Sequence, residues 1–312
     1  MSRFDEQYLD LCHRILDHGE KITTNPAVLA KNTQGAVQTN MPTHLAQTAK
    51  PTTTYSLPHQ VLQFDLAEEF PILTTKRVAF KTAALEMLWI YQVASNDVKW
   101  LHDRGIKFWD EWEIPASGIY AKKDYKKLYR EKGLKESPVG TIGTAYGWIV
   151  NRYQLTSSLI ETLKTDPANR RMIMSLWQNE WLPTAALPSC VWNSQWNVTG
   201  GKLNLMVTVR SNDVPLGMPF NVSQYATLCY LLAQVTGLQP GQMTYVINNA
   251  HIYENQVSGI KEQFTKPSYP APTLWLNPDI TDFFKFDNSK ELKDIRLENY
   301  QHAGTIKMPV TE

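Results

Sequence analysis

The sequence predicts an α+β fold in a single domain, and three observations support this interpretation. Segments with helical and with strand-like apolar spacing follow one another in irregular order, and two strands flank a turn signal suited to a hairpin. No Gly/Ser-rich or Pro-rich linker divides the 312 residues. No internal repeat or low-complexity tract is visible. We therefore expect one domain over residues 1–312.

The composition excludes several classes of protein. The 31 Lys and Arg residues against 30 Asp and Glu give a net charge of +1, whereas a protein that coats nucleic acid is normally distinctly basic. No apolar run is long enough to cross a membrane. Three scattered cysteines, Cys12, Cys190 and Cys229, are too few for a disulfide framework or a thiolate zinc site. The first seven residues are polar and resemble no secretion signal. We expect a cytoplasmic protein without a metal, a membrane or DNA as partner.

Apolar spacing assigns the elements of the first half of the chain. It predicts a helix over Phe4–Leu16, ended by Gly19, a strand over Gln60–Asp65 and a helix over Phe80–Ala94. Glu86 stands in the middle of this otherwise apolar second helix. Residues 23–57 are rich in Thr, Gln, Asn and Pro, and we interpret them as a long polar loop.

We interpret the region around residues 113–140 as a surface insertion. Between Tyr120 and Ser137, seven Lys and Arg residues are interrupted by three acidic ones. This mixture favours a solvated surface over a phosphate-binding patch.

The second half of the chain contains the clearest strand pattern. The spacing predicts a helix over Leu155–Lys164, a strand over Arg171–Trp177 and a helix over Val222–Val235 that Gly237 caps. Two further strands, Cys190–Val198 and Lys202–Arg210, flank the turn signal Thr199–Gly201.

The predicted hairpin brings a thiol and a cation together. If Thr199–Gly201 is a three-residue loop, Cys190 lies opposite Arg210, and a fixed cation facing a thiol favours the nucleophilic thiolate. A bulge would break this register. Taken alone, a cysteine that begins an apolar strand is most often an inert core residue. Arg210 favours a catalytic role, because an arginine there needs an anionic partner or an exposed end.

Polar residues after Arg210 predict a binding edge. Ser211, Asn212 and Asp213 add a hydroxyl, an amide and a carboxylate directly after the cation. Asn221 precedes the long helix, so it either caps that helix or offers an amide donor and acceptor to a pyrimidine-like edge.

Three other groups each allow a structural and a functional role. His251 and Tyr253 alternate and would share one face of a strand, as half-buried polar residues or as ligand contacts. Arg170-Arg171 suits either an exposed turn or phosphate binding. Trp109-Asp-Glu-Trp112 suits either core packing or a stacking wall for a flat ligand.

Taken together, these motifs resemble the thymidylate synthase family in order and spacing over about residues 60–312. The resemblance is greatest to the branch with valine after the motif cysteine. The matching segments are Leu187–Cys190, Arg210–Asp213, Leu216–Asn221, His251–Tyr253, Phe70–Lys76, Glu86–Trp89, Trp109–Trp112, Ala145–Gly147, Asn169–Arg171 and Lys307–Val310.

The resemblance implies a fold and a reaction. The fold would be a large mixed or antiparallel sheet covered by helices, with one sheet face used for dimerisation. The reaction would transfer a one-carbon unit and a hydride from 5,10-methylenetetrahydrofolate to C5 of dUMP, giving dTMP and dihydrofolate. The enzyme would be a methyltransferase without a metal.

The resemblance also implies residue roles on the nucleotide side. Cys190 would add to C6 of uracil, and Arg210 would activate the thiol and bind the phosphate. Asn221 would read the uracil amide edge. The remaining substrate contacts would be Ser211, Asn212, Asp213, His251 and Tyr253, with Arg170 and Arg171 reaching the phosphate of the partner subunit.

On the folate side, Glu86 would order water and protons, and Tyr146 would assist removal of the C5 proton. The folate would contact Trp109, Trp112, Leu187, Asp213, Lys76 and Thr311.

The sequence departs from the family pattern in the early loop. Family members usually carry another phosphate-binding arginine there, but no arginine lies between Arg14 and Arg77. Either Lys31 or Lys50 substitutes for it, or that phosphate contact is absent.

Two other functions remain as alternatives. A pyrimidine nucleotide hydroxymethylase would use the same nucleophile and folate, but water would capture the methylene; Trp109 favours methylation, and Asn221 favours uracil. A nucleotide- or RNA-binding regulatory protein on this scaffold would not need Cys190 and Glu86 together.

Overall fold

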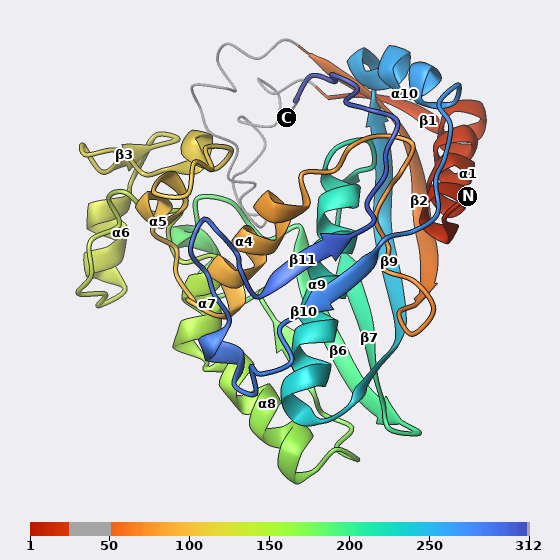
Figure 1. The fold of residues 1–312 in the computed structure, drawn as a ribbon. Helices are drawn as coiled ribbons and strands as arrows, with labels where there is room; N and C mark the ends of the chain where they lie inside the picture. The colour runs from red at the N-terminus through yellow and green to blue at the C-terminus, as the bar shows by residue number, and fades with distance from the viewer. Residues whose placement is uncertain (25–50, 311–312) are drawn as a thin grey trace.

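The computed structural model describes residues 1–24 and 51–310, which fold around a seven-stranded mixed sheet (Figure 1). Its strands are β1 (Glu20–Thr24), β2 (Thr52–Asp65), β5 (Ile173–Ser175), β6 (Val191–Thr199), β7 (Lys202–Val209), β8 (Asn212–Asp213) and β9 (Gln239–Tyr253). The order is β1-β2-β9-β7-β6-β5, and β8 pairs with β9. β9 is parallel to β7 and β8, and the other pairs are antiparallel. The α+β fold with a large mixed sheet is confirmed.

Helices cover one face of this sheet (Figure 1). The α-helices of the described residues are α1 (Arg3–His18), α4 (Phe80–Tyr91), α5 (Val98–His102), α6 (Tyr125–Glu131), α7 (Gly147–Arg152), α8 (Leu155–Thr165), α9 (Gly217–Thr236) and α10 (Val257–Gln263), of which α5 and α6 lie beside the sheet and not over it. α1 packs on β2 and β9, α9 packs on β7 and β9, and α4 packs on α9. No helix in the described ranges is long and apolar enough to span a bilayer.

The period-two alternation of the strands explains which face is covered. Leu205, Val207 and Val209 of β7 are at most 2% exposed and face the helices, together with Tyr245 of β9. The opposite face carries Val61, which is 54% exposed. In register with Val61 lie half-buried residues, first Val246 of β9 and then Thr208 of β7.

Two small sheets lie outside the main one. β10 (Thr273–Leu276) pairs with β11 (Ile295–Glu298), and β3 (Ile119–Tyr120) pairs with β4 (Lys123–Asp124).

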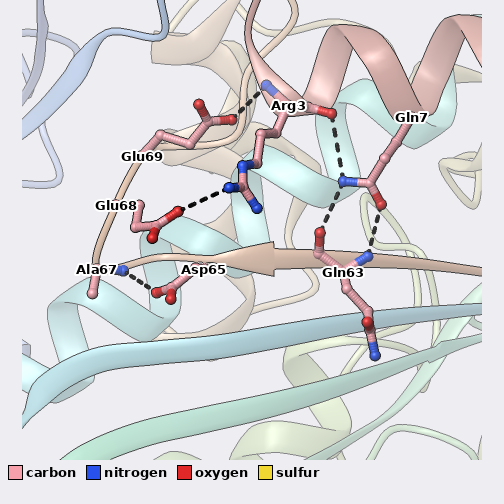
Figure 2. Close-up of polar contacts among 7 residues, drawn as sticks. All are labelled: Arg3, Gln7, Gln63, Asp65, Ala67, Glu68 and Glu69. Atoms are coloured by element: carbon pink, nitrogen blue, oxygen red, sulfur yellow. Dashed lines mark hydrogen bonds and ion pairs between the residues drawn. The ribbon is translucent and has the colours of Figure 1, made fainter.

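α1 is fixed to β2 and the turn after it by side chains at its beginning (Figure 2). Gln7 Nε2 donates to the Gln63 carbonyl at 2.8 Å, and Gln63 N donates back to Gln7 Oε1 at 2.9 Å. The Arg3 backbone N donates to Glu69 at 2.8 Å, and the Arg3 guanidinium lies 3.4 Å from Glu68. This exposed ion pair adds little to stability. The Gln7 side chain, by contrast, bonds to both the N–H and the carbonyl of Gln63, and so connects α1 to the backbone of β2.

Part of the polar segment 23–57 was predicted wrongly as a loop. Residues 20–24 and 52–56 form the antiparallel β1–β2 pair, in which Glu20 lies opposite Ser56 and Thr24 opposite Thr52. β2 therefore begins eight residues before the predicted Gln60. The reason is that the Thr-rich stretch of β2 has high strand propensity although its pattern is not apolar. Residues 25–50, with Lys31 and Lys50, lie outside the described residues.

The predicted hairpin exists, but its loop was wrong. Thr199 pairs with Lys202, so only Gly200 and Gly201 form the turn, and both have positive φ, 59° and 75°. Such a two-residue turn matches the twist of paired strands. The register is consequently one residue away from the prediction over most of the hairpin.

A bulge at Trp192 restores the predicted juxtaposition of Cys190 and Arg210. Asn193 pairs with Thr208, but Val191 pairs with Val209, which leaves Trp192 without a partner position. Beyond the bulge the Arg210 backbone N donates to the Cys190 carbonyl at 3.0 Å. The two deviations from the predicted register thus cancel at the end of the hairpin that carries the thiol.

The insertion at 113–140 is solvated only on its outside. Most of its charged side chains are exposed, as predicted. Tyr120, Tyr125 and Tyr129, by contrast, are at most 5% exposed. These tyrosines pack β3 and α6 onto the rest of the molecule.

Candidate active site

One end of the sheet gathers most of the predicted site residues. β6 begins there and β7 ends there, which places Cys190 beside Arg210. β8 pairs with the last part of β9, so that Asp213 lies opposite His251. Because these strands begin or end at the same end of the sheet, residues 20 and 40 positions apart in the sequence meet there.

The thiol of Cys190 is half-buried and lies beside a fixed guanidinium. Arg210 Nη2 is 3.6 Å from Cys190 Sγ. The same guanidinium donates to the carbonyls of Ser189 and Pro188 at 3.1 and 2.9 Å. No acidic side chain within the described ranges pairs with Arg210, so its positive charge remains available to stabilise a thiolate and a second anion.

Tyr146 reaches the same cysteine from the beginning of α7. Its hydroxyl oxygen accepts the Cys190 backbone N–H at 3.1 Å. Its backbone has φ 46° and ψ −109°, a conformation that is strained for a side chain of this size. Burial raises the pKa of Tyr146, so the hydroxyl stays protonated.

Glu86 is a buried carboxylate on α4, 8% exposed. Trp109 Nε1 donates to its Oε1 at 2.7 Å, and Gln224 Nε2 donates to its Oε2. Burial raises the pKa of Glu86 to about 7, although both hydrogen bonds act to lower it. A carboxyl poised near neutral pH is suited to proton transfer.

A chain of polar side chains connects Glu86 to the strands. Tyr245 OH donates to Asn212 Oδ1 at 2.9 Å, and Asn212 Nδ2 donates to Asn221 Oδ1 at 3.3 Å. Asn221 Nδ2 donates to Gln224 Oε1 at 3.2 Å, and Gln224 leads on to Glu86.

The alternative that Asn221 caps α9 is wrong. The helix begins at Gly217 with Leu216 as its N-cap, so Asn221 lies in its second turn with its amide on the polar chain. Pro219 is tolerated because it stands in the first turn, where its missing N–H is not needed.

Asp213 is held from two sides. Leu216 N donates to its Oδ1 and Gln256 Nε2 to its Oδ2, both at 3.0 Å. Gln256 also donates to the Pro309 carbonyl at 3.1 Å, and its Oε1 accepts the Tyr253 N–H at 3.1 Å. Burial raises the pKa of Asp213.

Lys76 lies inside the protein next to this group. It is 5% exposed, and its Nζ donates to the Pro215 carbonyl. Burial lowers its pKa to about 8. Its predicted contact with a folate stays a prediction, because the ammonium already points into the interior.

His251 and Tyr253 share a face of β9, as their alternation predicts. Their rings are 5.1 Å apart and nearly perpendicular, and His251 Nδ1 lies 3.5 Å from Ser211 Oγ. Asn249 Nδ2 donates to the same Ser211 Oγ at 3.3 Å. Burial lowers the pKa of His251 to about 4, so the imidazole is neutral at physiological pH.

Aromatic rings stand beside the carboxylate and the thiol. The Trp109 ring lies 5.2 Å from that of Tyr146 and 5.3 Å from that of Trp112. Trp109 is buried, whereas Trp112 and Leu187 are half-buried. Trp109 therefore belongs to the core and to the wall of the site at once.

The structure does not bring Arg170 and Arg171 to this site within one chain. Both are exposed in the turn before β5, and neither meets an acidic side chain in the described part of the chain. Thr311 lies outside the described residues.

A cleft of about 880 Å³ opens between the beginning of α4 and residues 290–302. It reaches Leu85, the neighbour of Glu86, and its lining contains one acidic residue, Glu291. Its basic lining residues are Arg77, Lys81, Arg104, Lys290, Lys293 and Arg296. No group of three or more His, Cys, Asp or Glu side chains within residues 1–24 and 51–310 could hold a metal ion.

Sequence reasoning missed Gln224, Tyr245 and Gln256. Gln224 and Gln256 are at most 4% exposed, and Tyr245 is fully buried. Gln224 could have been found by its helical offset of three from Asn221, which places both amides on one side of the helix.

Known proteins with similar sequence and structure agree on one family. The family model described as thymidylate synthase matches residues 6–312. A thymidylate synthase of Clostridium beijerinckii is 45% identical over 313 residues, with 100% of both chains covered. One of Oenococcus oeni is 34% identical over 347 residues and covers 99% of both. The solved structure of thermostable thymidylate synthase A from Bacillus subtilis superimposes with a TM-score of 0.78 at 34% identity, over 98% of this chain and 99% of that one.

Proposed function

The chain belongs to the thymidylate synthase family, and from that premise we propose that it methylates dUMP to dTMP, with 5,10-methylenetetrahydrofolate as the donor of both the carbon and the hydride. Dihydrofolate is the second product. The observation that carries this proposal is the half-buried thiol of Cys190 beside the Arg210 guanidinium. The hydroxymethylase and RNA-binding alternatives find no support among the named relatives.

Cys190 acts as the nucleophile. Its thiolate adds to C6 of uracil, forms a carbon–sulfur bond and leaves an enolate whose C5 can attack the one-carbon unit. Arg210 stabilises the thiolate and binds the nucleotide phosphate, because its guanidinium is anchored by main-chain carbonyls and pairs with no acidic side chain of the described residues. When the methyl group is complete, the thiolate leaves C6 and is available again.

The nucleotide is recognised by groups at the same sheet end. Asn221 reads the amide edge of uracil, and Asn212 supports it. His251 and Tyr253 bind the deoxyribose hydroxyl, which suits a neutral imidazole that can donate or accept. Ser211 adds a hydrogen bond to the phosphate.

The residues assigned to the folate provide apolar packing for its pterin ring and groups for proton transfer. Trp109, Trp112 and Leu187 offer apolar side chains for a pterin ring to pack against, and Asp213 offers it a carboxylate. Glu86 orders water and holds the proton that C5 gives up, with Tyr146 beside it. Trp109 shields the exocyclic methylene from water, which favours hydride over hydroxide as its acceptor.

The basic cleft beside α4 suits the anionic glutamate end of the folate. Six Lys and Arg side chains line it against one Glu. Such a surface attracts carboxylates over several ångströms at low salt.

We propose a cytoplasmic homodimer in which each chain is a single domain over residues 1–312. The sheet face with Val61 and Val246, over which no helix of residues 1–24 and 51–310 lies, supports pairing through this face. Exposed Arg170 and Arg171 are free to reach the phosphate site of a partner subunit. The three free thiols suit a reducing compartment.

The test incubates the purified protein with dUMP and methylenetetrahydrofolate and follows dihydrofolate by absorbance and the nucleotide by mass. We expect dTMP and dihydrofolate in equal amounts. A hydroxymethyl nucleotide with tetrahydrofolate would overturn the proposal. Cys190→Ser should lower kcat by at least about 10³-fold while dUMP still binds, because the carbon–sulfur bond can no longer form.

A further inference from the structure

The amide of Gln224 has only one orientation that satisfies its neighbours. Its Nε2 faces two acceptors, the Glu86 carboxylate and the Ala83 carbonyl, the latter at 3.2 Å. If the amide turned over, its oxygen would face both acceptors, and two buried hydrogen bonds would be lost. The main-chain carbonyl of Ala83 cannot change its role, so this anchor persists at every pH.

The orientation of Gln224 fixes that of Asn221. Because Gln224 Oε1 is an acceptor, the Asn221 atom opposite it at 3.2 Å must be Nδ2. On its other side Asn221 Oδ1 accepts from Asn212 Nδ2, whose own oxygen accepts from the Tyr245 hydroxyl. Turning Asn221 over would pair an oxygen with an oxygen and an NH2 group with an NH2 group. The chain therefore runs in one direction, from Tyr245 to Glu86.

The direction of a side-chain amide matters for the choice of a pyrimidine. Uracil presents an N3–H donor next to an O4 acceptor, whereas cytosine presents an N3 acceptor next to an NH2 donor. An amide that complements one base meets the other with donor against donor and acceptor against acceptor. Unmatched polar groups in a desolvated site are costly, so amide direction determines which base is accepted.

We propose that Gln224 is a specificity-determining positioning residue: it holds the Asn221 amide in the direction that accepts uracil and rejects cytosine. This inference rests on the proposed function in one respect, that Asn221 is the residue that hydrogen-bonds to the pyrimidine base. Gln224 itself is 4% exposed and acts through Asn221.

The experiment compares the Kd of dUMP with that of dCMP by calorimetry in wild type and in Gln224→Met. Methionine fills a similar volume without a hydrogen bond that orients Asn221. We expect the preference for dUMP over dCMP to fall about tenfold, which corresponds to about 1.4 kcal/mol.

A second variant separates orientation from folding. Gln224→Glu, protonated on the oxygen that faces Glu86, still presents an acceptor to Asn221 Nδ2. We expect it to retain most of the preference for dUMP. Loss of the preference in Gln224→Glu to the same extent as in Gln224→Met would overturn the inference.

Gln263 provides the matched control. It is fully buried and also bonds at both ends, with its Nε2 donating to Thr75 Oγ1 at 2.9 Å and its Oε1 accepting from Tyr8 OH at 3.2 Å. Gln263→Met should lower stability but leave the ratio of the two Kd values unchanged. An unchanged ratio in folded Gln224→Met would also overturn the inference. Turnover of dUMP by the wild type tests the proposed function separately.

Discussion

Burial acts on Glu86, His251 and Tyr146 in the same sense, because it favours the neutral form of each. The effect on function differs between them. The pKa values of His251 and Tyr146 lie far from physiological pH. Both side chains therefore stay neutral at that pH and can serve as hydrogen-bonding groups. Of the three, Glu86 alone has a pKa near neutrality, about 7, which suits the proton transfer that we propose for it.

Replacement of Glu86 by Gln tests this assignment through the pH dependence of kcat. Below pH 7 the carboxyl is largely protonated, and above it the ionised form accepts from Trp109 and Gln224. We expect the wild-type kcat to rise as pH increases through about 7. In Glu86→Gln we expect kcat to be lower by about 10²-fold.

The comparison of the two pH profiles separates Glu86 from the thiol. Any rise that remains in Glu86→Gln belongs to Cys190 or another group. The part of the rise in kcat that is due to the Glu86 carboxyl is the difference between the wild-type and Glu86→Gln profiles. Parallel pH profiles of kcat in the two proteins would contradict the role given to Glu86.

At the residue scale, the sequence singled out the groups to which we assign chemistry but not the buried groups that orient them. Cys190, Arg210 and Asn221 stand in motifs with characteristic spacing; the structure places Cys190 beside Arg210, and Asn221 in the polar chain that leads to Glu86. Gln224 and Gln256 carry no such signal, because a glutamine is ordinary in a helix or loop until its buried partners are known. Those partners come from other elements, 138 residues away for the Gln224–Glu86 bond.

Among the elements, every long helix was predicted, but α9 begins at Gly217, five residues before the predicted Val222, and strand boundaries were predicted less well. α8 and the predicted helix over Leu155–Lys164 differ by one residue, because an amphipathic period is read locally. β2 was shortened in the prediction, since the threonines of its first half pair with β1 and are only half-buried, so they show no apolar pattern. The register of the hairpin depended on a turn type and a bulge that only the three-dimensional pairing reveals.

The glycine turn provides a prediction at the scale of the element. Gly200 and Gly201 both require positive φ, and a Cβ at either position meets no atom within 4 Å. We therefore expect Gly200→Ala and Gly201→Ala each to lower the free energy of unfolding by about 1 kcal/mol, through backbone strain alone. Urea denaturation measures the change.

Turnover of the same variants distinguishes strain in the turn from damage to the site. Because the bulge at Trp192 lies between the turn and Cys190, kcat should stay within about twofold of wild type. Gly200→Asn should cost less than Gly200→Ala, since asparagine tolerates this conformation. A large loss of kcat with unchanged stability would mean that the turn sets the position of the thiol.

At the scale of the whole molecule, the described part of one chain has a sheet face that no helix covers and a pair of exposed arginines. The face with Val61 and Val246 has no helix over it in the described structure, and Arg170 and Arg171 are exposed away from the thiol of their own chain. A two-fold dimer would use both, because an isologous interface presents each site with the same residues of the other subunit. The sequence alone suggested this arrangement only through family resemblance.

Subunit complementation tests the shared site. Cys190→Ser and the double variant Arg170→Ala/Arg171→Ala should each be weakly active as homodimers. After mixing and subunit exchange in equal amounts, half of the dimers contain one complete site. We expect about a quarter of the wild-type activity per subunit.

The complementation has an internal control. A mixture in which both altered chains carry Cys190→Ser should stay inactive. If the two variants exchange subunits, as followed by native mass spectrometry, but no activity returns, the arginines do not serve the partner's site.

The bulge at Trp192 has a practical consequence for redesign. It divides the hairpin into a part near the thiol and an outer part with its own register, so a change in the outer part need not propagate to Cys190. An epitope or a fluorophore inserted between Thr199 and Lys202 would therefore label the enzyme at the end of the sheet remote from its chemistry. For the same reason, natural insertions between β6 and β7 are expected to leave kcat nearly unchanged.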